Sequence, residues 1–148
     1  MNHLAIYNTK AYGDDYIKLM LEGIKTVDSK FMFRRTVPYK CISIGDVIYL
    51  KESSGPIRGR IRVDAVVDQA LQDPQEVMEF LAPHCLQLGI KDEAHLMRVW
   101  EANVAKRYVT QWRMSCPEPI AYPVYIIKHD MRIWISDYNV PEEVMVAF

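Results

Sequence analysis

Residues 23–35 gather four cations around one carboxylate, within the stretch GIKTVDSKFMFRR. The carboxylate belongs to Asp28. The cations belong to Lys25, Lys30, Arg34 and Arg35. A lysine ammonium binds a phosphate or carboxylate group as a point charge. A carboxylate can orient such a lysine, or accept a hydrogen bond from the amino group of a nucleobase. These residue types at this spacing predict a site for an anionic, nucleotide-like ligand.

The spacing leaves two interpretations open. If residues 26–30 are extended, side chains alternate along them, so Asp28 and Lys30 face one side together with Thr26. Lys25 then faces the opposite side. Asp28 and Lys30 could form an ordinary surface ion pair, worth about 0–1 kcal/mol. Alternatively, Lys25 and Lys30 meet an anionic substrate while Asp28 orients one of them.

A second basic pattern follows the loop SSGP, in the run IRGRIRVDAVV. Its apolar residues alternate and predict one face of a strand, which places Arg58, Arg60 and Arg62 together on the other face. With Arg34 and Arg35 they would form a rim that contacts phosphates and adds affinity and salt sensitivity without base specificity. Each arginine alone is equally compatible with a solvated charge.

The distribution of charge and aromatic residues favours a nucleic-acid partner. Residues 25–62 hold nine lysines and arginines against three acids, so they carry +6 and leave −7 for the rest of a chain whose net charge is −1. A basic segment of this kind is a candidate footprint for a polyanion, although basic blocks are often simply solvated. The aromatic candidates to stack a splayed base, with core packing as the alternative, are Tyr39, Tyr49, Tyr108 and Trp112.

Composition narrows the class of protein. The 148 residues are 50% hydrophobic and 25% charged, which predicts one globular domain over residues 1–148. Because no apolar run approaches the roughly 18–20 residues that span a bilayer, we expect no membrane partner and a cytoplasmic location. The three cysteines lie far apart and are interpreted as reduced core thiols. Histidines and cysteines do not cluster, so neither a metal nor another cofactor is predicted.

Local patterns predict the elements that must position the basic stretch. Residues 4–7 form a short apolar run typical of a strand. A helix should follow, since Asp14 or Asp15 can cap its start and Gly23 stands where a left-handed C-terminal residue is favoured. Its apolar stripe is expected at Ile17, Met20, Leu21 and Ile24. The basic stretch therefore begins where this helix ends.

The rest of the chain alternates between strand and helix patterns. Strands are predicted at 26–33, 47–50, 57–67 and 107–115. Asp73 and Asp92 can cap helices, with a short helix between them that ends near Gly89, and the last helix should face the core with Met97, Trp100 and Val104. The run CPEPIAYP is interpreted as a loop, and VYIIK and RIWIS as a hairpin. The fold class is α+β, a mostly antiparallel sheet or small barrel with helices inserted between strand groups.

The segment from Gly23 to Lys30 resembles the G-x-K-x-x-E-x-R signature of the ASCH family, and Gly45-Asp46-Val47-Ile48 follows in the expected order. The resemblance implies a PUA-like β-barrel that binds RNA, a nucleotide or a modified nucleoside in a cleft beside the signature. The implied ligand residues are Gly23, Lys25, Asp28 and Lys30, with the five arginines as a rim. Asp28 replaces the usual glutamate and Lys30 the usual arginine, and lysine cannot form the planar fork that arginine offers a phosphate.

The resemblance also leaves an enzyme open. One branch of similar proteins hydrolyses acetylated cytidine with a signature lysine as base and a threonine three residues later as nucleophile. Here Lys25 could be that base and Thr26 a nearby hydroxyl, but the third position after Lys25 is Asp28. Cleavage of RNA, with the cations stabilising the pentacovalent phosphate, is a second enzymatic alternative. A protein partner for the acidic residues 64–101 is a third possibility.

Overall fold

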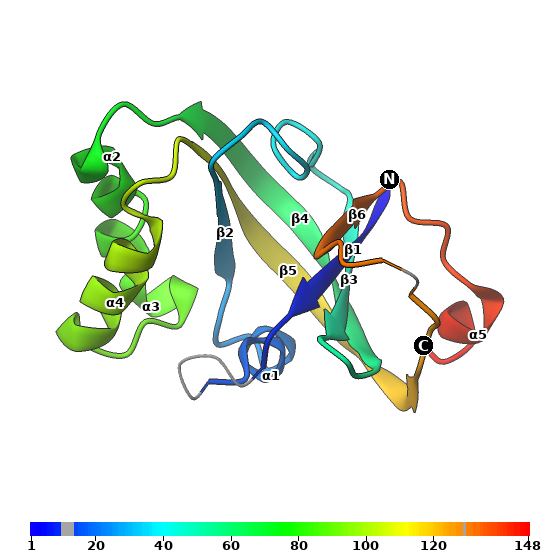
Figure 1. Ribbon diagram of the computed structural model, residues 1–148. Coiled ribbons are helices and arrows are strands. Elements are labelled where there is room, and N and C mark those ends of the chain that lie inside the picture. Colours follow the sequence, from blue (N-terminus) through cyan, green and yellow to red (C-terminus); the bar gives the residue numbers. More distant parts are fainter. Residues whose placement is uncertain (10–13, 129) are drawn as a thin grey trace.

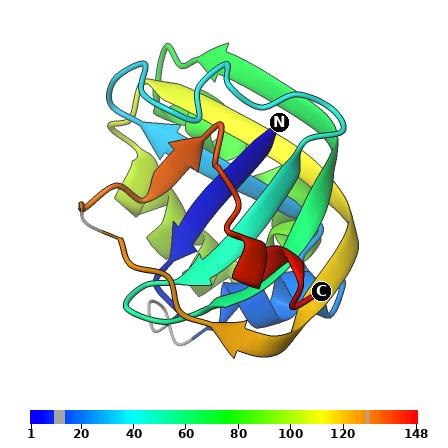
Figure 2. The same ribbon diagram turned by 90° about the vertical axis from the view of Figure 1, so that its right-hand side faces the viewer.

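A curled, six-stranded sheet organises the chain in the computed structural model, which describes residues 1–9, 14–128 and 130–148. The strand order is β2-β5-β4-β3-β1-β6, and the sheet curls into a half-barrel (Figures 1 and 2). The strands are β1 (Asn2–Tyr7), β2 (Val27–Met32), β3 (Val47–Glu52), β4 (Ile57–Ala70), β5 (Tyr108–Val124) and β6 (Trp134–Ser136). β1 and β3 run parallel and the other neighbours antiparallel, so the predicted α+β class with a mostly antiparallel sheet is confirmed.

Helices cover the sheet in three places. They are α1 (Tyr16–Leu21), α2 (Pro74–Glu79), α3 (Cys85–Leu88), α4 (Glu93–Asn103) and α5 (Glu142–Met145), with a 3-10 turn at Ala82–His84. Figure 1 shows α2, α3 and α4 gathered beyond the β2 edge, with α5 at the opposite end of the molecule. In the described part of the chain, no helix is long and apolar enough to cross a membrane.

Three apolar clusters divide the core between the two faces of the sheet. Because successive side chains of a strand point to opposite faces, Ala5 and Leu4 enter different clusters. One face packs against α1 through Ile17 and Met20. On the other face, Phe31 and its neighbours pack beneath α2–α4, and Leu4 and its neighbours pack beneath α5 and the C-terminal segment.

α1 lies close against β4 because of one glycine. A Cβ on Gly59 would stand 2.8 Å from the backbone oxygen of Glu118 and closer still to a methyl group of Leu21. The predicted cap is also present, since Asp15 accepts a hydrogen bond from the backbone N–H of Lys18. Gly23 has the expected left-handed backbone, with φ of +74°. Ile24 lies outside the apolar stripe, since its side chain is exposed where the chain leaves the helix.

The helical layer confirms two predicted caps and corrects one stripe. Asp73 accepts a hydrogen bond from the N–H of Glu76, and Asp92 accepts one from the N–H of His95. Of the residues predicted for the buried side of α4, Trp100 packs against the core and Val104 is half-buried, but Met97 is wrong. Met97 is exposed, and the side chains that pack against the core cluster are Leu96, Val99 and Trp100.

Two predictions for the C-terminal third are wrong. β5 continues to Val124 through the prolines that were interpreted as a loop. A proline has no N–H to donate to the ladder, and register shifts in the pairing of β5 with β4 accommodate the prolines. The predicted hairpin is absent from the described residues. β6 pairs instead with β1, so Leu4 faces Ile135 across the ladder.

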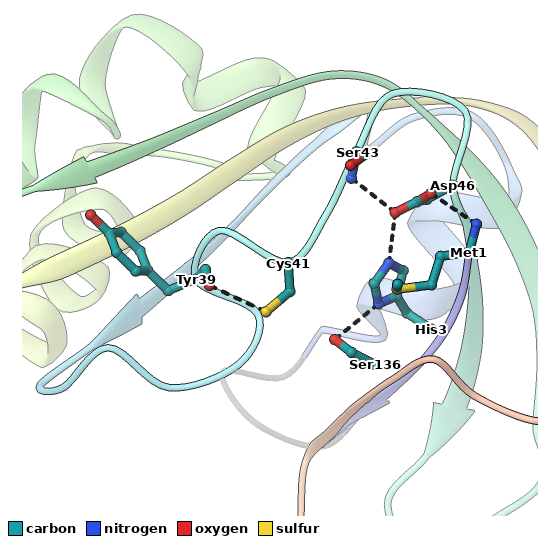
Figure 3. Close-up of polar contacts among 7 residues, drawn as sticks. All are labelled: Met1, His3, Tyr39, Cys41, Ser43, Asp46 and Ser136. Carbon is teal, nitrogen blue, oxygen red and sulfur yellow. Dashed lines mark hydrogen bonds and ion pairs between the residues drawn. The ribbon is translucent and has the colours of Figure 1, made fainter.

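A buried polar network joins the start of β1 to the turn before β3 (Figure 3). His3 is fully buried, with Nε2 2.9 Å from Asp46 Oδ2 and Nδ1 3.2 Å from Ser136 Oγ. Asp46 also accepts hydrogen bonds from the Ser43 N–H, at 2.8 Å, and the Met1 amino group, at 3.1 Å. Since 43 residues separate His3 from Asp46, sequence spacing could not indicate this pair.

The cysteines are free, but they are not all in the core. Cys41 and Cys85 are half-buried, and Cys116 is exposed on β5, which corrects its interpretation as a core thiol. Within the described residues, no group of three or more histidines, cysteines and acids is placed to hold a metal ion.

Candidate ligand-binding site

A cavity of about 210 Å³ lies beside β2, between that strand and the helices α1, α3 and α4. β2 is an edge strand, paired with β5 alone, so the cavity lies at the free edge of the sheet. Its polar lining comprises Tyr16, Lys25, Asp28, Ser29, Lys30, Asn103 and Lys106. Its apolar lining comprises Phe31, Leu81, Leu88, Ile90 and Val99. An apolar wall with a few convergent polar groups is typical of small-molecule sites.

Lys25 is held at the base of the cavity by three partners. Its side chain is only 4% exposed, and its Nζ donates a hydrogen bond of 2.6 Å to the backbone oxygen of Leu88. The same Nζ lies 3.2 Å from Asp28 Oδ1 and 5.0 Å from the centre of the Tyr16 ring. Simple alternation placed Lys25 and Asp28 on opposite sides. That prediction is wrong because β2 begins only at Val27, so Lys25 lies in the turn that follows α1.

Asp28 is satisfied on both of its oxygens. Oδ2 accepts a hydrogen bond of 2.6 Å from the Tyr7 hydroxyl, and Oδ1 accepts one of 3.0 Å from the Ser29 N–H. Burial raises the pKa of Tyr7 well above its usual value, and the Asp28 charge and hydrogen bond raise it further, so this hydroxyl stays neutral. Asp28 thus links the end of β1 to the start of β2.

Lys30 has a different environment from Lys25. No carboxylate of the described residues lies within ion-pair distance of its ammonium, so the predicted ion pair with Asp28 is wrong. Burial lowers the pKa of Lys30, the Asp28 charge opposes this shift, and Lys106 lowers it further. Lys106 also lacks a carboxylate partner among the described residues, and its Nζ lies 4.8 Å from the centre of the Phe33 ring. Two ammonium groups without carboxylate partners therefore line the cavity together.

Comparison with solved structures relates this architecture to known proteins. The structure superposes on ASCH from Zymomonas mobilis with a TM-score of 0.63 and 12% sequence identity, over 99% of this chain and 92% of that one. Two variants of the Zymomonas protein, one with tyrosine replaced by phenylalanine and one with serine replaced by alanine, match with TM-scores of 0.61 and 0.60. Each shares 13% identity, over 98% of this chain and 94% and 92% of theirs respectively.

The chain has the fold of an ASCH domain. No family model matches the sequence, and no curated protein does either. At 12–13% identity the similarity to the Zymomonas structures is a similarity of fold alone. The expectation of an ASCH-type, PUA-like fold is confirmed.

Within the ASCH fold, the structure brings together only part of the predicted site. Lys25, Asp28 and Lys30 line one cavity. Gly23 and Thr26 are close in sequence but are not among its lining residues. The Thr26 backbone is instead tied to the helical layer and to β5, through hydrogen bonds with Gln87 and Met114.

None of the five predicted rim arginines lines the cavity. Two follow the end of β2 and three lie on β4. Arg34 and Arg35 are exposed just beyond the end of β2. Arg58 instead bonds Asp15 at the start of α1, with 2.6 Å between Nη1 and Oδ2. Arg60 forms a two-point pair with Glu118 and lies 4.1 Å from the Phe148 ring centre. Arg62 is exposed beside it on β4.

The aromatic candidates also divide. Trp112 and Tyr49 are buried in separate core clusters, as the core-packing alternative predicted. Tyr39 and Tyr108 pack against each other with ring centres 5.1 Å apart. Sequence reasoning missed Tyr7, Tyr16 and Lys106 as site residues, because no motif marks any of them. Tyr16 belongs to the helix directly before the signature, whereas Tyr7 and Lys106 come from outside the helix and strand that flank it.

Proposed function

We propose that the protein binds single-stranded RNA and holds one nucleotide in the cavity beside β2. The observation that supports this most is that Lys30 and Lys106 line the same apolar-walled cavity. Neither ammonium has a carboxylate partner among the described residues. Both side chains are half-buried, and holding two like charges together there is costly unless an anion compensates them. A phosphate group would supply that anion.

The other lining residues suit a nucleobase. At about 210 Å³ the cavity admits one ring system rather than a longer ligand. Phe31 and Val99 offer apolar contact to a base, while Ser29 and Asn103 offer polar atoms to its edge. Asp28 is already saturated by Lys25, Tyr7 and Ser29, so its role in this proposal is to hold Lys25 in place rather than to read the base.

A strip of cations and aromatic rings continues from the cavity past the end of β2. We call it the basic-aromatic strip, and its members are Phe33, Arg34, Arg35, Tyr39, Lys40, Lys106 and Tyr108. Arg35 lies 5.5 Å from the centre of the Tyr108 ring, and Lys40 lies 5.7 Å from that of Tyr39. Phe33 is 61% exposed beneath Lys106. Stacking on such rings contributes about 1–3 kcal/mol per base and tolerates any sequence.

The hydrolase alternative has less support from the geometry. It needs Lys25 free to act as a base beside the Thr26 hydroxyl. Lys25 is engaged by the Leu88 carbonyl and by Asp28, and Thr26 is not among the cavity-lining residues.

Fluorescence anisotropy with a labelled single-stranded RNA of about eight nucleotides tests the proposal, since single-strand sites span about 4–16 nucleotides. Lys30→Met and Lys106→Met should each weaken binding by about tenfold or more, because each removes a charged contact to phosphate. The matched control is Lys18→Met, which removes an exposed ammonium from α1. Equal affinities for Lys30→Met, Lys18→Met and the unmodified protein would contradict the proposal, as would the absence of RNA binding.

A further inference from the structure

Lys51 is a buried ammonium on the far side of the sheet from the RNA site. Its side chain, on β3, is only 6% exposed, and its Nζ donates one hydrogen bond, of 3.0 Å, to the backbone oxygen of Glu52. Across the described residues, no carboxylate lies within ion-pair distance of this Nζ. The Glu52 carboxylate is itself engaged by the Thr9 hydroxyl at 2.8 Å. A buried ammonium with one carbonyl partner has two N–H donors left to satisfy.

Lys51 lines a cavity of about 420 Å³ between the β3–β4 turn and the C-terminal segment. Two serines of that turn, Ser53 and Ser54, form one wall together with Gly55. Tyr125, Met131 and Ile133 contribute an apolar wall from the C-terminal segment. This cavity shares no lining residue with the one beside β2. The two cavities lie at different strands of the sheet, since β3 is three positions from β2 in the strand order.

The rim of the cavity adds positive charge. Lys128 and Arg132 both line it, and both are paired with a single acid, Asp130, at 3.2 Å and 2.8 Å. Asp130 lines the cavity too, so this rim has two positive charges and one negative charge. Lys51 adds a third positive charge to the cavity. Burial lowers the pKa of Lys51, and the nearby Lys128 charge lowers it further, while Glu52 opposes the shift. The cavity therefore combines a desolvated cation, a cationic rim and two hydroxyl donors.

We propose that this cavity is a second binding site, which takes the phosphate group of a small phosphorylated compound. The phosphate accepts hydrogen bonds from the two free donors of Lys51, with Ser53, Ser54 and Lys128 in reach around the same hollow. The apolar wall contacts the organic part of the compound. The proposal is independent of RNA binding at β2, because it depends on none of the same residues.

Thermal unfolding with inorganic phosphate as the probe tests this site. In phosphate-free buffer, Lys51→Met should melt at a higher temperature than the unmodified protein, because it removes a buried charge whose partner is missing. Added phosphate should stabilise the unmodified protein in a saturable way and should stabilise Lys51→Met far less, with the affinity reduced about tenfold or more. Lys18→Met is the matched control and should respond to phosphate like the unmodified protein.

Three outcomes would overturn the inference. The first is no saturable effect of phosphate on the unmodified protein. The second is a phosphate response in Lys51→Met equal to that of Lys18→Met. The third is a loss of RNA affinity in Lys51→Met without any binding of free phosphate, which would make Lys51 a contact for the RNA backbone instead. Lys128→Gln, at the more exposed rim, repeats the test without changing the buried position and should weaken phosphate binding as well.

Discussion

At the scale of single residues, Asp28 stabilises the segment Gly23–Lys30 through its side-chain contacts. It pairs with the almost fully buried Lys25 and accepts the Tyr7 hydroxyl, so removing its charge leaves a buried ammonium without a counter-ion. We expect Asp28→Asn to lower the free energy of unfolding by about 2–4 kcal/mol. Urea denaturation measures it, with Glu101→Gln, an exposed acid on α4, as the control that should change little.

A double-mutant cycle separates this pairing from general disruption. Lys25→Met combined with Asp28→Asn should be less destabilised than the sum of the two single variants, since the pair is removed together, with a coupling of about 0.5–3 kcal/mol. Strict additivity would mean that the 3.2 Å contact between Lys25 and Asp28 contributes nothing to stability.

Lys30 makes the proposed RNA binding depend on pH. Its pKa is lowered from 10.5 by burial and by Lys106, so in the folded protein it loses its proton at a lower pH than an ordinary lysine does. The unfolded chain then binds more protons than the folded one between the two pKa values, so stability of the free protein rises with pH through that window. RNA affinity should change in the opposite direction and fall as the pH rises through the lowered pKa.

The control for that prediction is Lys30→Arg, because a guanidinium stays charged throughout the range. Anisotropy titrations at a series of pH values should show the unmodified protein losing affinity before the arginine variant does. Parallel curves for the two proteins would mean that Lys30 does not titrate in the complex or does not contact the ligand.

At the scale of elements, the sequence predicted those whose signals are local and missed those decided by distant partners. The caps at Asp15, Asp73 and Asp92 and the bend at Gly23 each depend on a few neighbouring residues, and all are present. The hairpin predicted for β6 is wrong because the partner of β6 is β1, more than a hundred residues away in the sequence. The prolines of β5 suggested a loop because nothing local reveals that register shifts can absorb them.

The network around Asp46 connects three such elements and predicts acid sensitivity. Burial alone would raise the pKa of Asp46, but hydrogen bonds from His3, Ser43 and the terminal amino group outweigh it and lower the pKa below 3.8. A carboxyl group with a lowered folded pKa contributes stability that is complete above its unfolded pKa and is lost as the pH falls through the folded value. The network should therefore weaken below about pH 4.

Asp46→Asn tests this contribution. The variant should be about 1–3 kcal/mol less stable at neutral pH and should lose less further stability between about pH 5 and pH 2. Urea denaturation at several pH values gives both quantities. An acid limb as steep as that of the unmodified protein would assign the acid sensitivity to other carboxyl groups.

At the scale of the whole molecule, the sequence located the basic segment but not its division between surfaces. Residues 25–62 form one candidate footprint in the sequence, yet Lys30 lies on the edge strand β2, Arg58 bonds Asp15 at the start of α1, and Lys51 lines a separate cavity. Strand order decides this separation, because β4 and β3 lie two and three positions from β2 in the sheet. Lys106, from outside the basic segment, completes the cavity instead.

That separation predicts different salt dependences of RNA binding for two triple variants. In one variant, Arg34, Arg35 and Lys40 of the basic-aromatic strip are changed to glutamine. In the other, Lys18, Arg62 and Arg98, which are exposed outside the strip, are changed in the same way.

Each phosphate contact to a single strand contributes about 0.7 to the slope of log affinity against log salt concentration. The first variant should therefore lose up to about two units of slope, and the second almost none. Anisotropy titrations at several salt concentrations measure both slopes. Since the chain as a whole carries a net charge of −1, an equal loss in the two variants would mean that RNA responds to the general field of the protein and not to a strip beside β2.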